Sequence, residues 1–93
     1  MKFFDWDEEK NRQLKKERSI SFEDVLIVIE GERILDIMDH PNKKRYPKQK
    51  IYVVAINGYA YLVPFIEDDE KYFLKTIIPS RKMTKRYLKG GGK

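Results

Sequence analysis

The sequence predicts a single α+β domain, in which two N-terminal helices pack on an antiparallel sheet of about four or five strands and a short basic helix follows. Three runs rich in Val, Ile, Tyr and Phe follow one another over residues 49–78, and an amphipathic helical pattern precedes them over residues 21–31. A chain of 93 residues suits one folding unit. We therefore expect one domain over residues 1–93, with residues 89–93 as a flexible tail.

The N-terminal segment begins with aromatic residues and continues with many charges. Residues 2–6 are short and partly alternating, so we expect an edge strand there. Asp5 or Asp7 can then cap a helix that runs to about Arg18, because a carboxylate accepts hydrogen bonds from the free N–H groups of a first turn. Leu14 is the only apolar residue within this helix, which indicates a helix on the surface.

The second helix has the clearest sequence signals. Ser21 can cap it, and Asp24 three residues later can close a capping box. Gly31 is expected to end it in the position that follows the C-cap. The apolar stripe toward the core has helical spacing and consists of Phe22, Val25, Leu26 and Ile29.

Residues 32–38 favour a strand, with Ile34, Leu35 and Ile37 directed inward. The segment that follows has the composition of a loop and holds His40 and Tyr46. The centre of the sheet comes next. Asn57-Gly58 favours a type I′ hairpin turn, because both central residues of that turn need positive φ, and four acidic residues form a looser second hairpin. The expected central strands span residues 49–56, 59–66 and 71–78.

Both faces of these central strands carry apolar residues, whereas a solvated face would be mostly polar. One interpretation is that helices cover one face while tyrosines with polar tips line the other. The alternative is that the second face is a docking or ligand surface, with Tyr52, Tyr59 and Tyr61 on it.

The end of the chain is basic. Ser80 can cap a final helix over residues 81–88, with Met83 and Tyr87 on one face. Residues 1–39 carry a net charge of −4 and residues 40–93 carry +9, a concentration that favours a polyanion such as nucleic acid. A charge set that only keeps the protein in solution is the alternative. The two basic clusters are Lys43, Lys44, Arg45, Lys48 and Lys50, and Arg81, Lys82, Lys85, Arg86, Lys89 and Lys93.

The composition excludes several classes of function. Without cysteine the chain has no disulfide and no thiolate ligand or nucleophile, and His40 as the lone histidine cannot share a metal with other imidazoles. No apolar run approaches the length of a membrane span, and the N-terminus lacks an apolar signal segment. We therefore expect a cytoplasmic protein that needs no metal or other cofactor and no membrane.

Arg, Lys, Tyr and His side chains suffice for metal-free RNA cleavage, because the 2′-OH of RNA is an internal nucleophile that needs alignment, proton transfer and charge stabilisation. Arg81 and Arg45 are the candidates to hold a phosphate, and His40 or Tyr46 is the candidate for proton transfer. Tyr46 or Tyr87 could instead stack on a base. The same residue types also serve binding without cleavage. Candidate RNA contacts are Lys43, Lys44, Lys48, Lys82, Lys85 and Arg86.

Three segments in the same order resemble the BrnT family of type II toxins, small ribonucleases with a RelE-like fold. Residues 4–10 (FDWDEEK) match its Phe-x-Trp-Asp-x-x-Lys segment, and residues 20–24 (ISFED) match a hydrophobic-Ser-Phe-Glu segment. Residues 77–84 (IIPSRKMT) resemble its Ile-Ile-Ser-Ala-Arg-x-x-Thr segment. The chain departs from the family at Leu14 and at residues 17–19, where members usually carry Asn and Lys-His-Gly.

The resemblance implies a translation-inhibiting ribonuclease, held inactive by a cognate antitoxin that has a ribbon-helix-helix DNA-binding part. The two proteins would form a hetero-oligomer that binds operator DNA only through the antitoxin. The resemblance carries over Arg81 as the phosphate-binding residue, with Arg45 as a second arginine. Two alternatives remain: a non-catalytic module with the toxin fold that binds an antitoxin or nucleic acid, and a regulator that binds DNA directly.

Overall fold

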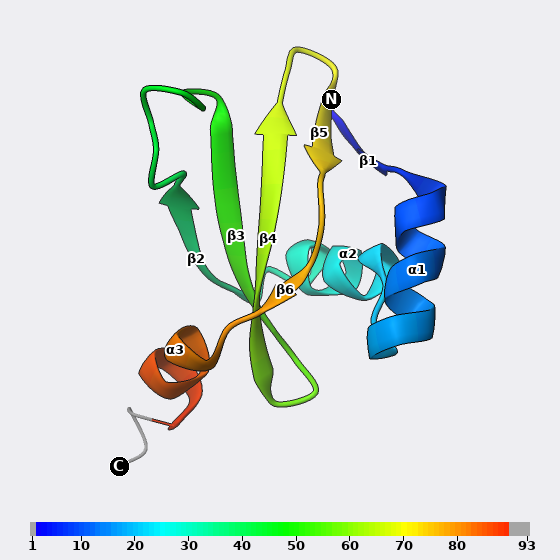
Figure 1. Ribbon diagram of the computed structural model, residues 1–93, viewed down its shortest axis with the longest axis vertical. Coiled ribbons are helices and arrows are strands. Elements are labelled where there is room, and N and C mark those ends of the chain that lie inside the picture. Colours follow the sequence, from blue (N-terminus) through cyan, green and yellow to red (C-terminus); the bar gives the residue numbers. More distant parts are fainter. Residues whose placement is uncertain (1, 90–93) are drawn as a thin grey trace.

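A six-stranded sheet forms the centre of the computed structural model, which describes residues 2–89 (Figure 1). The strand order is β1-β5-β4-β3-β2, and β6 pairs with β4. The strands are β1 (Phe3–Trp6), β2 (Ile34–Asp39), β3 (Gln49–Ile56), β4 (Tyr59–Glu67), β5 (Lys71–Leu74) and β6 (Ile78–Pro79). The helical elements are α1 (Glu8–Arg18), α2 (Phe22–Glu30), α3 (Arg81–Thr84) and a π-helical turn, η1 (Lys85–Lys89). This architecture confirms the predicted fold class, and residues 90–93 of the predicted tail lie outside the described residues.

The β3–β4 hairpin is the longest pairing of the sheet and keeps one register from end to end. Its turn is Asn57-Gly58, with φ of 54° and 77°. Positive φ at both central residues is the signature of the type I′ turn, whose twist matches that of the flanking strands. The predicted hairpin and its turn are therefore confirmed.

The strand predicted over residues 71–78 is correct only in its first half. The chain leaves the ladder after Leu74 and returns to β4 as β6. Between the two strands, Ile77 is fully buried in the core, and its carbonyl accepts a hydrogen bond of 3.0 Å from Arg18 Nη1. The interruption thus frees a backbone carbonyl for α1 and places an apolar side chain beneath the helices.

The edge strand predicted at the N-terminus is present as β1, but its partner makes the sheet mixed. β1 runs parallel to β5, whereas all the other strand pairs are antiparallel. Phe4 stacks on Tyr72 of the neighbouring strand with ring centroids 4.9 Å apart. The expectation of a purely antiparallel sheet is therefore wrong at this edge, because two helices intervene between β1 and the rest of the sheet.

α1 and α2 cover one face of the sheet (Figure 1). Asp7 caps α1, and Ser21 and Asp24 form the predicted capping box of α2. Phe22 is fully buried and stacks on Trp6 at 5.5 Å. No helix within residues 2–89 has the length and apolar character needed to cross a membrane.

The end of α2 differs in detail from the prediction. Gly31 follows the helix as expected, but its φ is −82°, and Glu32 adopts the left-handed conformation with φ of 57°. A Cβ atom on Gly31 would lie 3.1 Å from Arg33 Nε and 3.2 Å from the Ile27 carbonyl oxygen. Space, rather than positive φ, is therefore what favours glycine at this position.

Tyr52 and Tyr61 lie on the face that the helices cover, whereas both interpretations placed these tyrosines on the second face. Tyr52 is 6% exposed and stacks on Phe65, and Tyr61 packs against the same core. Tyr59, next to the Asn57-Gly58 turn, is only partly buried and lines a pocket with Arg81, Thr84 and Lys85 of the C-terminal segment. Tyr52 and Tyr61 therefore belong to the core beneath the helices rather than to a solvated face.

The second face carries aliphatic residues of β3 and β4, including Val53 and Leu62. α3 and η1 pack on the part of this face that lies near the Asn57-Gly58 turn, through Met83, Tyr87 and Leu88 (Figure 1). The predicted pairing of Met83 and Tyr87 on one helical face is thus confirmed. The basic C-terminal segment sits on the sheet face opposite α1 and α2.

Candidate nucleic-acid interface

α3 begins at a fixed point on β4. The Ser80 backbone N–H donates to the Ala60 carbonyl at 3.0 Å, and the Ser80 hydroxyl caps the helix by accepting from the Met83 N–H. Thr84, which is 2% exposed, accepts a hydrogen bond of 2.9 Å from the Ala60 N–H and donates one of 2.8 Å to the Ser80 carbonyl. These bonds hold the first turn of α3 in one orientation on the sheet.

A pocket of about 430 Å³ lies beside this anchored turn and is lined by Tyr59, Arg81, Thr84 and Lys85. Within residues 2–89, neither Arg81 nor Lys85 takes part in an ion pair. The Thr84 hydroxyl already donates one hydrogen bond and accepts another. Tyr59 therefore supplies the hydroxyl that is available to a ligand in this pocket. Two free cations and a phenol can bind a phosphate group and donate a hydrogen bond to it.

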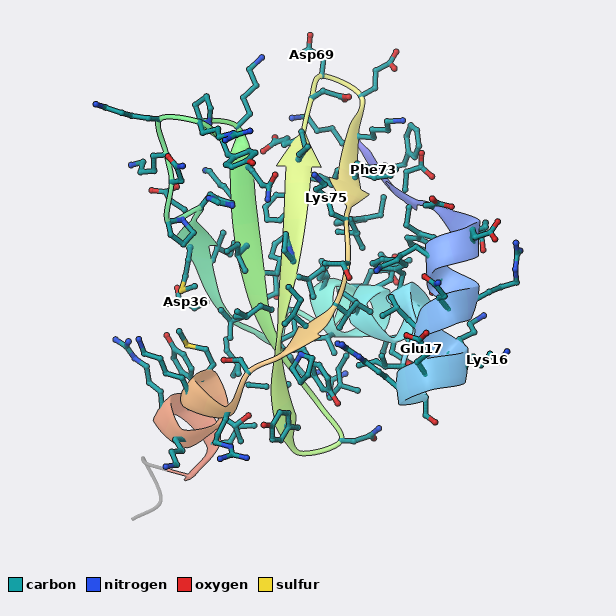
Figure 2. All side chains as sticks on the ribbon, viewed as in Figure 1. Lys16, Glu17, Asp36, Asp69, Phe73 and Lys75 are labelled. Carbon is teal, nitrogen blue, oxygen red and sulfur yellow. The ribbon has the colours of Figure 1, made fainter. Side chains whose placement is uncertain are left out.

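The rest of the C-terminal segment is fixed by a carboxylate on the edge strand. Tyr87 Oη donates a hydrogen bond of 2.7 Å to Asp36 Oδ2, and Figure 2 shows Asp36 on β2 close to α3. This bond is the main cause that lowers the pKa of Asp36, and it raises the pKa of Tyr87. Tyr87 therefore acts as a structural donor in this conformation. Lys82, Lys85 and Arg86 remain exposed around it.

A β-bulge explains how Asp36 reaches this position. The register of β2 against β3 shifts between Ile34 and Asp36, so that Leu35 packs against the α3 side and Asp36 opposes Val53. A bulge breaks the strict alternation of side chains. Ile37, which was predicted to point inward, pairs with Tyr52 on this edge strand but is 52% exposed.

The remaining candidate residues lie in the β2–β3 loop at the other end of the sheet (Figure 1). The rings of His40 and Tyr46 are 4.5 Å apart, and the Arg45 guanidinium carbon lies 5.6 Å from the Tyr46 ring centroid. His40 Nδ1 accepts a hydrogen bond of 3.0 Å from the Asn42 N–H, which leaves Nε2 to carry the proton of the neutral ring. Lys43 pairs with Asp39 at 3.1 Å. Lys44 and Lys48 are exposed.

The structure does not bring the four candidate catalytic residues together. Ser80, the residue before Arg81, is hydrogen-bonded to Ala60, which pairs with Ala55 of β3. At the other end of β3, the backbone N–H of His40 donates to the Gln49 carbonyl. Ala55 and Gln49 are six residues apart along β3, which corresponds to about 20 Å. One phosphate therefore cannot contact Arg81 and the His40–Tyr46–Arg45 group at the same time.

Tyr59 is the residue of the Arg81 pocket that the sequence indicated only for a possible ligand surface on the sheet, and not as a neighbour of Arg81. Its place directly after the Asn57-Gly58 turn was predicted, but the return of the C-terminal segment to that turn was not. The β4–β6 pairing brings about this return, through Leu62 opposite Ile78 and Tyr61 opposite Pro79.

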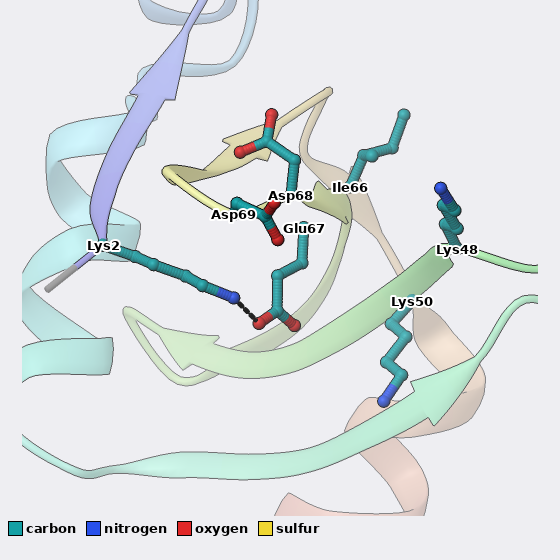
Figure 3. A pocket seen from close by; sticks show the side chains of 7 residues that line it. All are labelled: Lys2, Lys48, Lys50, Ile66, Glu67, Asp68 and Asp69. Atoms are coloured by element: carbon teal, nitrogen blue, oxygen red, sulfur yellow. Dashed lines mark hydrogen bonds and ion pairs between the residues drawn. The ribbon is translucent and has the colours of Figure 1, made fainter.

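A second pocket, of about 620 Å³, lies at the β4–β5 end of the sheet and has a mixed charge (Figure 3). Lys2 forms an ion pair with Glu67 across it, and Asp68 accepts hydrogen bonds from the N–H groups of Glu70 and Lys71. Its carboxylates oppose the binding of a phosphate, so we do not assign the nucleic-acid contact to this pocket. Within residues 2–89, no group of three or more His, Cys, Asp or Glu side chains could hold a metal ion.

Comparison of the chain with protein-family models, with curated proteins and with solved structures finds no match in any of the three.

Proposed function

We propose that this protein is the toxin of a type II toxin–antitoxin system, a metal-independent endoribonuclease of the BrnT type that inhibits translation. The observation that carries the proposal is the pocket in which Arg81, Lys85 and Tyr59 meet, with both cations free of ion pairs among the described residues. The three sequence segments that resemble the BrnT family give the proposal its specific form.

In the proposed reaction the RNA supplies its own nucleophile. The 2′-oxygen attacks the adjacent phosphorus, a P–O2′ bond forms, and the P–O5′ bond breaks to leave a 2′,3′-cyclic phosphate and a 5′-hydroxyl. Arg81 and Lys85 stabilise the additional negative charge on the phosphorane. Tyr59 donates a proton to the departing 5′-oxygen, the 2′-hydroxyl proton passes to water, and Tyr59 regains a proton from water after the product leaves.

The proposal includes the partners that the resemblance implies. A cognate antitoxin of the ribbon-helix-helix type neutralises the protein in a hetero-oligomer, and operator DNA is bound only through the antitoxin. Such a pair works in the cytoplasm, where its RNA substrate is. His40, Tyr46 and Arg45 have no direct part in the chemistry at Arg81, because they lie at the other end of β3.

The test is expression of the full chain with and without Arg81→Ala, followed by growth measurements and by cleavage assays on purified RNA in the presence of a metal chelator. The matched control is Lys16→Ala, which removes a cation on α1, away from α3 (Figure 2). We expect growth arrest and metal-independent cleavage from the wild type and from Lys16→Ala, but not from a folded Arg81→Ala protein. Equal toxicity of Arg81→Ala would show that the pocket is not the active site.

The second candidate function is a non-catalytic module that has the toxin fold and binds RNA or an antitoxin. The position of His40, remote from the Arg81 pocket, favours it, because the pocket then lacks the residue type best suited to proton transfer near neutral pH. RNA binding without 2′,3′-cyclic phosphate products would support this module over the nuclease.

A further inference from the structure

Several hydrogen bonds connect residues within the β2–β3 loop, which projects from the sheet. Residues 41–48 are all exposed to solvent. Asn42 organises them: its side-chain oxygen accepts from the Arg45 N–H at 3.2 Å, and its carbonyl accepts from the Tyr46 N–H at 3.0 Å. The Gln49 N–H then donates to the Tyr46 carbonyl at 3.2 Å. A loop built in this way presents its side chains in a fixed arrangement before any ligand arrives.

Tyr46 is the centre of this arrangement. Its side chain packs against the His40 ring at 4.5 Å, yet the residue is 38% exposed. Beside it lies a pocket of about 270 Å³, to which Pro47 and Ile66 contribute apolar surface and Arg45 a cation. An exposed aromatic ring that packs against a second ring, next to an apolar recess and a guanidinium group, resembles the surfaces on which proteins stack the bases of single strands.

The loop opens on the same face of the sheet as the Arg81 pocket. Ile66 and Gln49, which line the recess, pair with each other and have the same parity along their strands as Leu62 and Val53, against which the α3 side packs. The separation of about 20 Å between the two sites corresponds to roughly six nucleotides stacked at the spacing of a helical strand, and to fewer in an extended strand.

We propose that the β2–β3 loop is a second subsite for single-stranded RNA, in which a nucleobase stacks on Tyr46 while Arg45 and Lys44 contact neighbouring phosphates. This inference rests on the proposed function, because the same strand would occupy the Arg81 pocket at the other end of the sheet. The subsite increases the affinity for RNA by binding one nucleobase, and it fixes the position of the RNA strand relative to the Arg81 pocket. It takes no part in bond cleavage.

The test separates base stacking from charge. Fluorescence anisotropy would measure the affinity of the full chain for a twelve-nucleotide 2′-O-methyl oligouridine, which cannot be cleaved, and for an abasic strand of equal length and charge. Tyr46→Ala is expected to weaken binding of the oligouridine by about tenfold or more, the loss of one base–aromatic stack, and to leave the abasic strand unaffected. Tyr46→Phe should bind both strands like the wild type. Ile27→Ala, a change on the exposed side of α2, is the surface control.

Other outcomes distinguish this inference from the function on which it rests. Binding of neither strand by the wild type would count against the proposed function itself. If Arg81→Ala weakens binding but Tyr46→Ala and Tyr46→Leu do not, the Arg81 pocket stands and the stacking subsite is refuted. Tyr46→Leu keeps apolar bulk against His40, so it remains informative if the alanine variant does not fold. Equal loss on both strands, or loss of antitoxin neutralisation alone, would also overturn the stacking subsite.

Discussion

The hydroxyl of Tyr87 donates a hydrogen bond of 2.7 Å to the carboxylate of Asp36, a residue 51 positions earlier in the chain. The bond joins η1, at the C-terminal end of the described chain, to the edge strand β2, on which a β-bulge directs Asp36 toward the α3 side. It also keeps a negative charge close to the exposed cations Lys82, Lys85 and Arg86. The position of the proposed RNA contact thus depends on a pairing between two distant segments.

Tyr87→Phe removes this bond and is expected to return the pKa of Asp36 toward the ordinary value of about 3.9. Because the folded-state pKa of Asp36 is lowered, the bond stabilises the protein above that ordinary value, and its contribution is lost as pH falls through the lowered pKa. The raised pKa of Tyr87 means that the contribution is also lost when pH rises through it, above about 10.

The measurement for Tyr87→Phe is an NMR titration of the Asp36 carboxyl, together with unfolding experiments over a range of pH. We expect the stability difference from the wild type to be largest between pH 4 and 10, roughly, and to shrink outside it. Tyr46→Phe, which removes an exposed hydroxyl in the other loop, is the control. An unchanged Asp36 pKa in Tyr87→Phe would mean that the bond does not persist in solution.

Thr84→Val is expected to destabilise the protein by about 1–3 kcal/mol, because it leaves the buried N–H of Ala60 without its acceptor. It should also weaken RNA binding although it removes no charge, since Thr84 anchors the helix that carries Arg81. Urea unfolding measures the first effect and anisotropy the second. Thr84→Ser keeps the hydroxyl and should retain most of the stability and most of the RNA binding. If the serine variant loses as much of each as the valine variant, the methyl group of Thr84 is responsible instead.

Local chemistry made much of this fold predictable. The bounds of β3, the Asn57-Gly58 turn and the Ser21–Asp24 capping box depend on neighbours within a few residues, so the sequence contains the information. The parallel partner of β1 and the interruption before β6 depend on contacts across the chain. No periodicity in the sequence indicates which strand an isolated tetrapeptide will join.

The candidate site was predictable in its residue types but not in its geometry. The sequence indicated Arg81 and the basic residues around it, together with His40 and Tyr46, as one set. The sheet instead divides them between its two ends, because one group follows β2 and the other returns beside the β3–β4 turn through β6. Tyr59 enters the Arg81 pocket only through that return. Distance along a strand, which composition does not reveal, decides which residues can act together.

Asn11 is the polar residue of α1 whose role the sequence did not reveal. It is fully buried, its Oδ1 accepts a hydrogen bond of 2.8 Å from the Phe22 N–H, and its Nδ2 donates one of 2.8 Å to Glu23 Oε1. The second bond is the main cause that lowers the pKa of Glu23. Asn11 therefore ties α1 to the first turn of α2.

Asn11→Ala is expected to lower the free energy of unfolding by about 1–3 kcal/mol, because the buried Phe22 N–H loses its acceptor. Asn11→Asp keeps an acceptor for that N–H but places a second carboxylate next to Glu23. We therefore expect a loss of folding stability at neutral pH, and a smaller loss when either carboxyl is protonated. Urea unfolding at pH 7 and at pH 4 measures both variants, with Gln13→Ala on the exposed side of the same helix as the control. Wild-type stability of Asn11→Asp at pH 7 would contradict the contact with Glu23, since two adjacent carboxylates cannot both stay ionised without cost.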